Sequence, residues 1–330
     1  MNPSKVESCC DSDAPSSPFT FAVVSGQVGL LDWIGANSAL IESALCERGA
    51  IWFRNFGVTA VEDFEQISAS VLRDVYKENS EHTPITENGV VQRPVPYSPV
   101  HELLWHNENI FNHRWPTRIV FCCQEAAENG GETTLVDTRS MFRALGGGIT
   151  SKFASKNVRY IRRYGGIGLD WRKIFRAQSR NAVEASCREA GMDFTWEPDG
   201  SLSTSAIRPG IVRSKATRDL CWFNQIQHWH PAALPSSLRQ ALEGTGGTLA
   251  LPRHCSFGDR TAIRDETVAT ILAAYRELEY SVRLATGDVL MVDNVLMAHG
   301  RKAFSGRRQI LVAMGDMASY KGTCDDYSIG

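Results

Sequence analysis

The sequence predicts a mainly β fold, a barrel or jelly roll with helices packed outside it. Three observations indicate this class. Turn residues separate many short β-rich runs, the helical runs are fewer and peripheral, and the candidate metal ligands described below must converge from positions far apart. The β-rich runs lie at 50–54, 117–123, 133–136, 157–164, 193–197, 202–207 and 220–224.

The N-terminal part of the chain combines a polar lead-in with an α/β layer. Residues 1–18 are rich in Ser, Asp, Pro and Cys and predict a disordered segment, so we expect one domain over 19–330 with helical insertions. Ser38 can begin a helix that runs to about Arg48. After the strand at 50–54, apolar residues at helical spacing predict a second helix that ends near Leu72.

The segment 77–103 is polar and contains four prolines, which is typical of a binding loop or lid. We expect it to form part of a substrate wall, with a solvated connector as the alternative. After the strand at 133–136, Asp137 or Thr138 can cap a helix. The glycines at 146–148 predict the end of that helix, because no Gly-Lys-Ser/Thr follows to make a phosphate loop.

The C-terminal half adds helices and the last strands of the sheets. A helix over 179–190 is closed by Gly191, and further helices are expected over 235–242 and 265–279. The apolar run within 287–294 predicts a buried strand entered by a turn, and later strands carry His299 and Arg308.

Composition excludes several classes of protein. Hydrophobic residues make up 43% and charged residues 22% of the chain, as in ordinary globular proteins. The net charge of −2 argues against nucleic-acid or anionic-membrane binding, and no apolar run approaches the ~20 residues of a membrane helix. Nine cysteines without a C-x-x-C pair predict reduced thiols in a cytoplasmic protein.

The chemistry is predicted by His106 and Glu108, which stand two positions apart. On one strand such residues share a face and can reach one metal ion. By itself, however, a His-x-Glu motif more often belongs to a surface strand that binds no metal. His299 is the candidate third ligand. Two histidines and one carboxylate form the facial triad of non-haem Fe(II) oxygenases, which leaves three coordination positions open.

Two later features strengthen this prediction. Thr133 follows a Gly-Gly-Glu turn, and Arg307-Arg308 follows His299. A hydroxyl and a guanidinium suit the distal end of a dicarboxylate cosubstrate. Adjacent residues of a strand face opposite ways, so only one of the two arginines can point inward. Arg308 is favoured over Arg307, because it shares its face with the apolar positions 310, 312 and 314.

Four stretches, 105–139, 160–175, 220–231 and 287–314, resemble the taurine dioxygenase / 2,4-D dioxygenase superfamily of Fe(II)/2-oxoglutarate enzymes. The resemblance covers about 49–317 and is strongest to the syringomycin-biosynthesis-type branch, whose members modify amino acids in natural-product pathways. It implies a double-stranded β-helix, the distorted, cupin-like jelly roll. It also implies catalytic Fe(II) held by His106, Glu108 and His299, with O2 and 2-oxoglutarate as cosubstrates, the latter bound by Thr133 and Arg308.

Glu108 stands where most members of the superfamily carry Asp, and the syringomycin-type branch tends to carry Glu. A small uncharged residue there would indicate a halogenase, so the resemblance implies oxygenation. Taurine dioxygenase keeps its sulfonate-binding arginine four residues after the residue matching Arg308. Val312 stands at that position here, which argues against a sulfonate substrate.

The resemblance thus implies a 2-oxoglutarate-dependent dioxygenase that hydroxylates or desaturates an unactivated C–H bond in antibiotic or other natural-product biosynthesis. The substrate would be an amino acid or a compound derived from one, free or on a peptidyl carrier protein. Whether the protein forms a homo-oligomer is left open. A zinc hydrolase with the same ligands and a non-catalytic barrel sensor are the alternatives. The candidate substrate residues, for each of which a structural hydrogen bond is the alternative role, are Asn109, Arg163, Asn224, Gln225 and His228.

Overall fold

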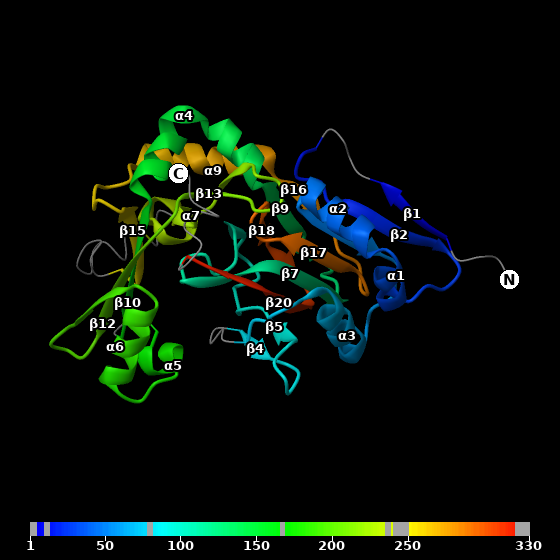
Figure 1. Ribbon diagram of the computed structural model, residues 1–330, viewed down its shortest axis with the longest axis horizontal. Helices are drawn as coiled ribbons and strands as arrows, with labels where there is room; N and C mark the ends of the chain where they lie inside the picture. The colour runs from blue at the N-terminus through cyan, green and yellow to red at the C-terminus, as the bar shows by residue number, and fades with distance from the viewer. Residues whose placement is uncertain are drawn as a thin grey trace.

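The computed structural model describes residues 5–9, 14–77, 82–165, 169–234, 239 and 251–320. Its centre is a pair of β-sheets that pack against each other (Figure 1). The larger sheet contains, in spatial order, β1 (Lys5–Cys9), β2 (Phe19–Ser25), β3 (Ala50–Arg54), β17 (Val289–Asp293), β7 (Arg114–Glu125), β20 (Gln309–Ser319), β5 (Gln92–Arg93) and β4 (Thr83–Pro84). The smaller contains β16 (Tyr280–Val282), β9 (Thr133–Asp137), β18 (Met297–Arg301) and β6 (Leu103–His106).

Strand alternation explains how the central strand β17 is buried on both faces. Leu290 and Val292 lie in the cluster between the two sheets, together with Leu135 of the smaller sheet. Val289 and Met291 point the other way, into the cluster under the N-terminal helices. The sequence prediction of a buried strand within 287–294 is therefore confirmed.

Helices cover the outer face of the larger sheet. Leu30, Ile41 and Phe64 pack from these helices onto Phe53 of β3. The helices lie at the N-terminal, blue end of the chain in Figure 1 and are α1 (Leu30–Ala36), α2 (Ser38–Arg48) and α3 (Val61–Val71). The predictions for 38–48 and for the helix ending near Leu72 are confirmed.

The smaller sheet is covered by α4 (Thr138–Lys156) and α9 (Asp265–Leu278). Ala298 of β18 faces this side and packs in a cluster with Ile271. The prediction that 146–148 end the first helix is confirmed at Gly146, where two helices meet across a kink with a non-helical backbone. Gly146 has φ 63° and kinks α4, and the helix then resumes, because glycine adopts this left-handed conformation without steric cost.

A separate lobe stands below these layers in Figure 1 and contains β10, β12, α5 and α6. Its core includes Tyr164, Trp171 and Val183. The lobe and the remaining elements are β10 (Val158–Tyr164), α5 (Trp171–Phe175), α6 (Arg180–Glu189), β11 (Asp193–Trp196), β12 (Leu202–Arg208), β15 (Arg253–Phe257), β13 (Ile211–Arg213), β14 (Leu220–Trp222), α7 (Ile226–Trp229), η1 (Pro231–Ala233), β19 (Phe304–Ser305) and β8 (Asn129–Gly130). The helix expected over 235–242 lies almost wholly outside the described residues.

The N-terminal segment differs from the expected disorder. Residues 5–9 form β1, which pairs antiparallel with β2, and Ser16 is buried and donates a hydrogen bond to the Leu278 carbonyl. A sheet edge offers backbone hydrogen bonds that need no apolar side chains, which is why composition did not indicate this strand.

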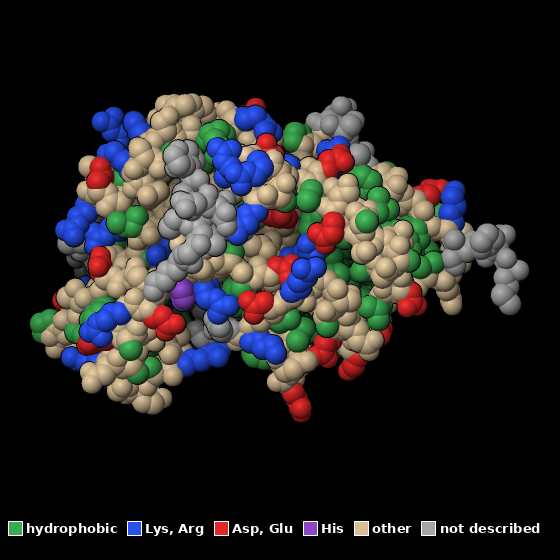
Figure 2. Space-filling view, in the orientation of Figure 1, with side chains coloured by type: hydrophobic (Ala, Val, Ile, Leu, Met, Phe, Trp, Pro, Cys, Tyr) green, Lys and Arg blue, Asp and Glu red, His purple; other side chains and the backbone are tan. Residues whose placement is uncertain are grey.

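Basic and acidic side chains are interspersed over the face seen in Figure 2, in line with the small net charge. Within the described ranges, no helix combines the length and the apolar character that crossing a bilayer requires.

Candidate metal centre

The two candidate histidine ligands face each other across neighbouring strands of the smaller sheet. His299 of β18 is paired directly with His106 at the end of β6, and their ring centroids are 4.5 Å apart. His299 pairs with His106 and Arg301 pairs with Leu103, so one residue lies between the two pairs on β18 and two residues lie between them on β6. The extra residue marks a β-bulge, a device that re-aims side chains beside functional sites.

Glu108 reaches the histidines from a turn and not from the strand. The expectation that His106 and Glu108 share a strand is wrong, since β6 ends at His106. Asn294 holds the turn instead. Its Oδ1 accepts the Glu108 N–H at 2.7 Å, and its Nδ2 donates to the Glu108 carbonyl at 3.0 Å.

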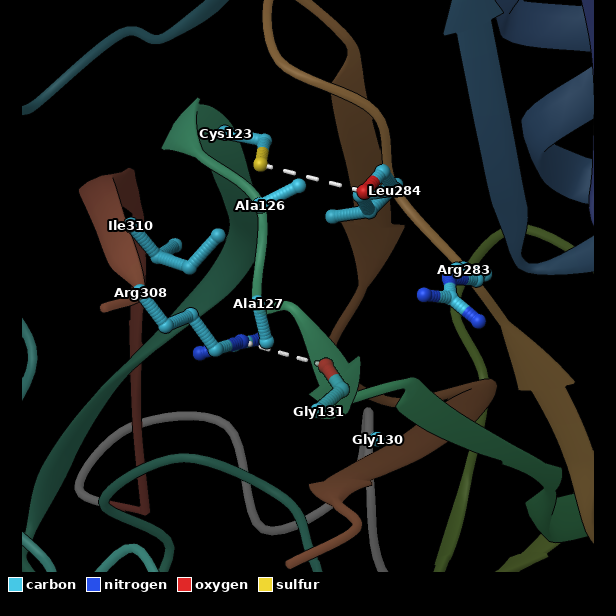
Figure 3. A pocket seen from close by; sticks show the side chains of 9 residues that line it. All are labelled: Cys123, Ala126, Ala127, Gly130, Gly131, Arg283, Leu284, Arg308 and Ile310. Carbon is cyan, nitrogen blue, oxygen red and sulfur yellow. Dashed lines mark hydrogen bonds between the residues drawn. The ribbon is translucent and has the colours of Figure 1, made fainter. Parts of the chain in front are cut away.

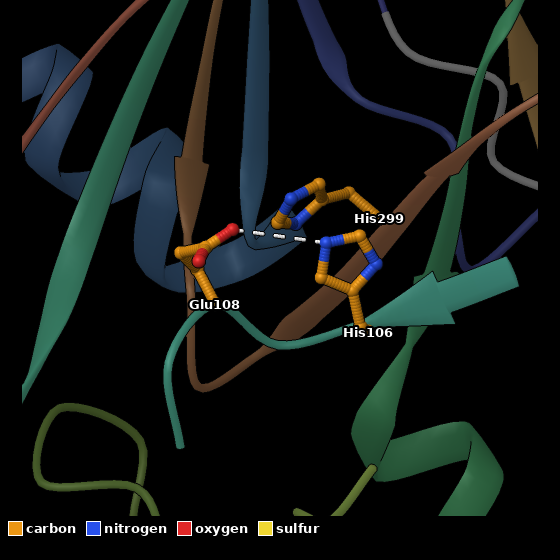
Figure 4. A group of neighbouring side chains, drawn as sticks. All are labelled: His106, Glu108 and His299. Atoms are coloured by element: carbon orange, nitrogen blue, oxygen red, sulfur yellow. Dashed lines mark ion pairs between the residues drawn. The ribbon is translucent and has the colours of Figure 1, made fainter. Parts of the chain in front are cut away.

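The three side chains form one cluster. Their candidate ligand atoms lie within 4.8 Å of one another, and the Glu108 Oε2 is 3.7 Å from the His106 Nε2 (Figure 4). Burial acts to raise the pKa of Glu108, but its side-chain interaction with His106 and the positive charge that His82, His106 and His299 can carry outweigh it and lower this pKa to about 2. Burial, with the charge of His106, lowers the pKa of His299 to about 3. An anionic carboxylate beside neutral imidazoles is the donor set that a divalent cation requires.

The His106 tautomer follows from its hydrogen bond. The Nδ1 lies 2.9 Å from the Leu104 carbonyl oxygen. Because a carbonyl can only accept, Nδ1 must carry the proton, and in the neutral ring the Nε2 lone pair is then left to face Glu108. This is the tautomer that a metal ligand needs.

Three side chains from the α7 segment bind the backbone of the metal strand. His228 lies 2.9 Å from the Leu104 carbonyl, Gln227 donates to the Trp105 carbonyl and Gln225 donates to the Asn107 carbonyl. A bulge leaves carbonyls outside the strand ladder, and α7 supplies donors for them. The structure thus gives Gln225 and His228 backbone-binding positions next to the metal ligands.

The other candidate substrate residues are spread out. Asn224 is fully buried and donates to the Gly210 carbonyl. Arg163 projects into the lobe, where it bonds Ser201 at 3.4 Å and lies 3.9 Å from Asp199. Asn109 follows Glu108 in the turn, and its Nδ2 is buried without a hydrogen-bond partner among the described residues. Of the five, Asn109 keeps a donor available beside the cluster.

The candidate ketoacid residues lie on the inner faces of the two sheets. Thr133 is buried and shares its strand face with Leu135, which is paired with His299. Arg308 stands immediately before β20 of the opposite sheet and donates through Nε to the Gly131 carbonyl at 3.1 Å. Figure 3 shows its guanidinium pointing at the turn that leads into β9. Burial and the charge of Arg301 lower the pKa of Arg308 to about 10.

The two neighbouring arginines face opposite ways, as expected from the sequence, although both precede the first residue of β20. Arg307 is 79% exposed and lies 3.4 Å from the Glu125 carboxylate. Arg308 is half-buried, and Ile310 and Val312 on its face belong to the core between the sheets. The geometry therefore favours Arg308 as the inward-facing arginine.

Three residues of this region were not predicted from the sequence. His82 is buried and acts electrostatically on both Glu108 and His299; its place in the proline-rich 77–103 segment was the available signal. Asn294 and Arg301 lie inside stretches that carried the resemblance. Their roles depend on partners distant in the sequence, and Arg301 could have been found from its position two residues after His299.

Comparison with known proteins identifies the group to which these features belong. Residues 15–314 match the family described as "Taurine catabolism dioxygenase TauD, TfdA family". The chain is 34% identical over 279 residues to the dapdiamide synthesis protein DdaC of Enterobacter agglomerans, with 84% of each chain covered. It is 24% identical over 287 residues to a clavaminate synthase-like protein of Arabidopsis thaliana, with 83% of each covered.

Solved structures show the same fold. PvcB of Pseudomonas aeruginosa matches with a TM-score of 0.54 at 14% identity, over 95% of this chain and 92% of PvcB; PvcB is described as an Fe, alpha-ketoglutarate dependent oxygenase. A taurine dioxygenase from Burkholderia xenovorans matches with a TM-score of 0.54 at 12% identity, over 96% and 97% of the two chains.

Proposed function

Because the chain belongs to the TauD/TfdA family of Fe(II)- and 2-oxoglutarate-dependent dioxygenases, we propose that it hydroxylates or desaturates an unactivated C–H bond of an amino acid or amino-acid-derived substrate. The observation that carries this proposal is the convergence of His106, Glu108 and His299 within 4.8 Å. Such a triad leaves one side of the metal open for a chelating ketoacid and O2.

The residues present fit a ferrous ion. The His106 tautomer leaves Nε2 available, Glu108 is anionic, and the Nδ1 of His299 is a buried atom without a partner among the described residues. A buried polar atom of this kind is normally satisfied by water, an ion or a ligand. His106, Glu108 and His299 would hold the metal.

The ketoacid would be oriented by the chain on both sides. Arg308 would bind its distal carboxylate, and the Thr133 hydroxyl would donate a further hydrogen bond. When bound, iron and ketoacid supply the oxidising chemistry, with succinate and CO2 as coproducts. The protein's own task is to orient the substrate C–H bond and to exclude water.

The proposed substrate class rests on the sequence relative and on the pocket residues. DdaC takes part in dapdiamide synthesis by its name, which supports an amino-acid-derived natural product here, either free or on a carrier protein. Asn109 offers a buried donor beside Glu108 that has no hydrogen-bond partner among the residues the structure describes. Val312 is buried among apolar side chains, where a sulfonate would find no cation.

We further propose that the facing sheets form a double-stranded β-helix within a single domain, and that the enzyme works in the cytoplasm. The smaller sheet supplies both histidines and the larger sheet supplies Arg308 by way of β20. This division supports an arrangement in which the metal and the ketoacid anchor would lie on opposite walls of one barrel.

The test is succinate release from 2-oxoglutarate with Fe(II), ascorbate and a panel of amino acids. We expect substrate-dependent succinate that requires O2, and its loss in His106→Ala. His254→Ala is the matched control, since His254 lies on β15 outside the cluster. Hydrolysis supported by Zn(II) without O2 or ketoacid would contradict the proposal, as would full turnover by His106→Ala.

A further inference from the structure

Arg301 is a buried arginine that the roles described so far leave unexplained. It stands two residues after His299 on β18, and residues two apart on a strand share a face. It is 8% exposed. On the neighbouring strand its pairing partner is Thr133. Arg301 therefore faces the same interior as the metal cluster and the Thr133 hydroxyl that is proposed to bind the ketoacid.

The hydrogen bonds that Arg301 makes within the described part of the chain go to neutral carbonyl groups. Its Nη2 donates to the carbonyl oxygens of Ser98 at 2.8 Å and His101 at 2.6 Å. Its Nε is buried and has no hydrogen-bond partner among the described residues. A buried guanidinium satisfied only by neutral carbonyls is costly, so this position favours a bound anion.

A second arginine lies close to the first. The guanidinium carbon of Arg301 is 4.7 Å from the Phe304 ring centroid, and that of Arg308 is 5.8 Å from the same centroid. Burial, and after it the charge of Arg301, lowers the pKa of Arg308. Two like charges around one ring repel each other, and an anion bound between them would stabilise both.

We propose that Arg301 is a second anchor for the distal carboxylate of 2-oxoglutarate, which it binds together with Arg308; this rests on the proposed function. Residues two apart on a strand are separated by about 6.7 Å, which suits a five-carbon diacid that extends from the metal at His299. One carboxylate then receives donors from both sheets, from Arg301 and Thr133 on one and from Arg308 on the other.

The test compares two ketoacids that differ only at the distal end. Mn(II)-loaded protein without O2 is titrated calorimetrically with 2-oxoglutarate and with 2-oxovalerate, which ends in a methyl group. For Arg301→Met we expect 2-oxoglutarate affinity to fall about 10- to 100-fold and 2-oxovalerate affinity to stay within about twofold. Arg301→Lys keeps the charge and loses the planar fork of the guanidinium. Its affinity for 2-oxoglutarate should lie between those of the wild type and Arg301→Met.

Two comparisons separate this role from others. Lys302→Met is the matched control, because Lys302 is paired with Glu102 and Glu279. This variant should leave the affinities for both ketoacids unchanged. If Arg301→Met lowers the affinity for both ketoacids equally, Arg301 only holds the Ser98–His101 loop. If it changes neither affinity, Arg301 has no role in ketoacid binding. Either result overturns the inference. If Arg308→Met alone lowers the preference for 2-oxoglutarate, the proposed function stands and the Arg301 anchor fails. Wild-type protein that binds neither ketoacid would overturn the proposed function itself.

Discussion

His106 and His228 donate to the same carbonyl oxygen, that of Leu104, each at 2.9 Å. The shared acceptor lies in the bulge of β6, between the strand and α7. Because both rings donate to it, the bond fixes the tautomer of His106 and ties the position of its ring to α7. Burial lowers the pKa of His228 to about 3, so this ring is neutral at physiological pH.

Replacement of His228 should therefore weaken metal binding without touching a ligand. His228→Leu keeps most of the volume and removes one donor to Leu104. We expect Fe(II) or Mn(II) affinity to fall about tenfold, as for other residues that orient a ligand, and the free energy of unfolding to fall by about 1–2 kcal/mol. Calorimetric metal titration checks this, with His254→Leu as control; an unchanged metal affinity in His228→Leu would show that the shared carbonyl does not position His106.

Asn294 should be needed to place Glu108. It is fully buried and binds the Glu108 N–H, the Glu108 carbonyl and the Pro116 carbonyl. Asn294→Ala should lower the free energy of unfolding by roughly 2–4 kcal/mol and lower metal affinity as well. Asn37→Ala removes one bond to the Trp33 carbonyl in the helical layer and should reduce stability alone. Equal metal affinity in the two variants would mean that Glu108 does not depend on Asn294.

Gly300 should be intolerant of any side chain. A Cβ there would lie 2.6 Å from the Leu103 carbonyl oxygen and 2.7 Å from the Thr134 Oγ1, so both neighbouring strands would have to move. We expect Gly300→Ala to cost about 1–3 kcal/mol of stability and to disturb the pairing of His299 with His106. Gly35→Ala, in α1 with open space around it, should be neutral or slightly stabilising. Urea unfolding of both variants measures the difference.

Arg308 and Arg307 offer a matched pair for the ketoacid. Arg308→Met should raise the dissociation constant for 2-oxoglutarate about 100-fold, since a charged hydrogen-bonded partner is lost. Arg307→Met removes an exposed cation paired with Glu125 and should change that constant less than twofold. The calorimetric titration used for Arg301 measures both, and the reverse order of effects would reassign the anchor to Arg307.

The features predictable from the sequence are those set by local pattern. The strand at Ala50–Arg54, the helix Ser38–Arg48 and the inward direction of Arg308 follow from periodicity and capping, which depend on near neighbours. The spacing of His106 and Glu108 indicated a shared site, but not that the strand ends at His106.

The unpredicted features depend on contacts between distant segments. Asn294 contacts Glu108 across 186 residues, and Gln225 contacts Asn107 across 118. A polar residue in a sequence does not indicate whether its partner will be a substrate or a backbone carbonyl. Gln225 and His228 were proposed to contact substrate for this reason, and the structure gives them carbonyl partners at Asn107 and Leu104.

His230 should make the fold sensitive to acid independently of the metal cluster. Its Nδ1 accepts the Ala232 N–H at 3.1 Å and its Nε2 donates to the Ile263 carbonyl at 3.0 Å, so the folded state needs the neutral ring. Burial lowers its pKa below 6.5 and the charge of Arg239 adds to this, while the hydrogen bond to the Ile263 carbonyl and the charge of Asp265 oppose it. The unfolded chain therefore takes up the proton first as pH falls below 6.5, and stability must decrease with acid, by at most about 1.4 kcal/mol per pH unit for one proton. Urea unfolding of wild type and His230→Gln at pH 7.5 and pH 5.0 measures this contribution. We expect the variant to be less stable at pH 7.5 but to lose less stability on acidification, and equal losses in the two proteins would exclude His230 as the titrating group.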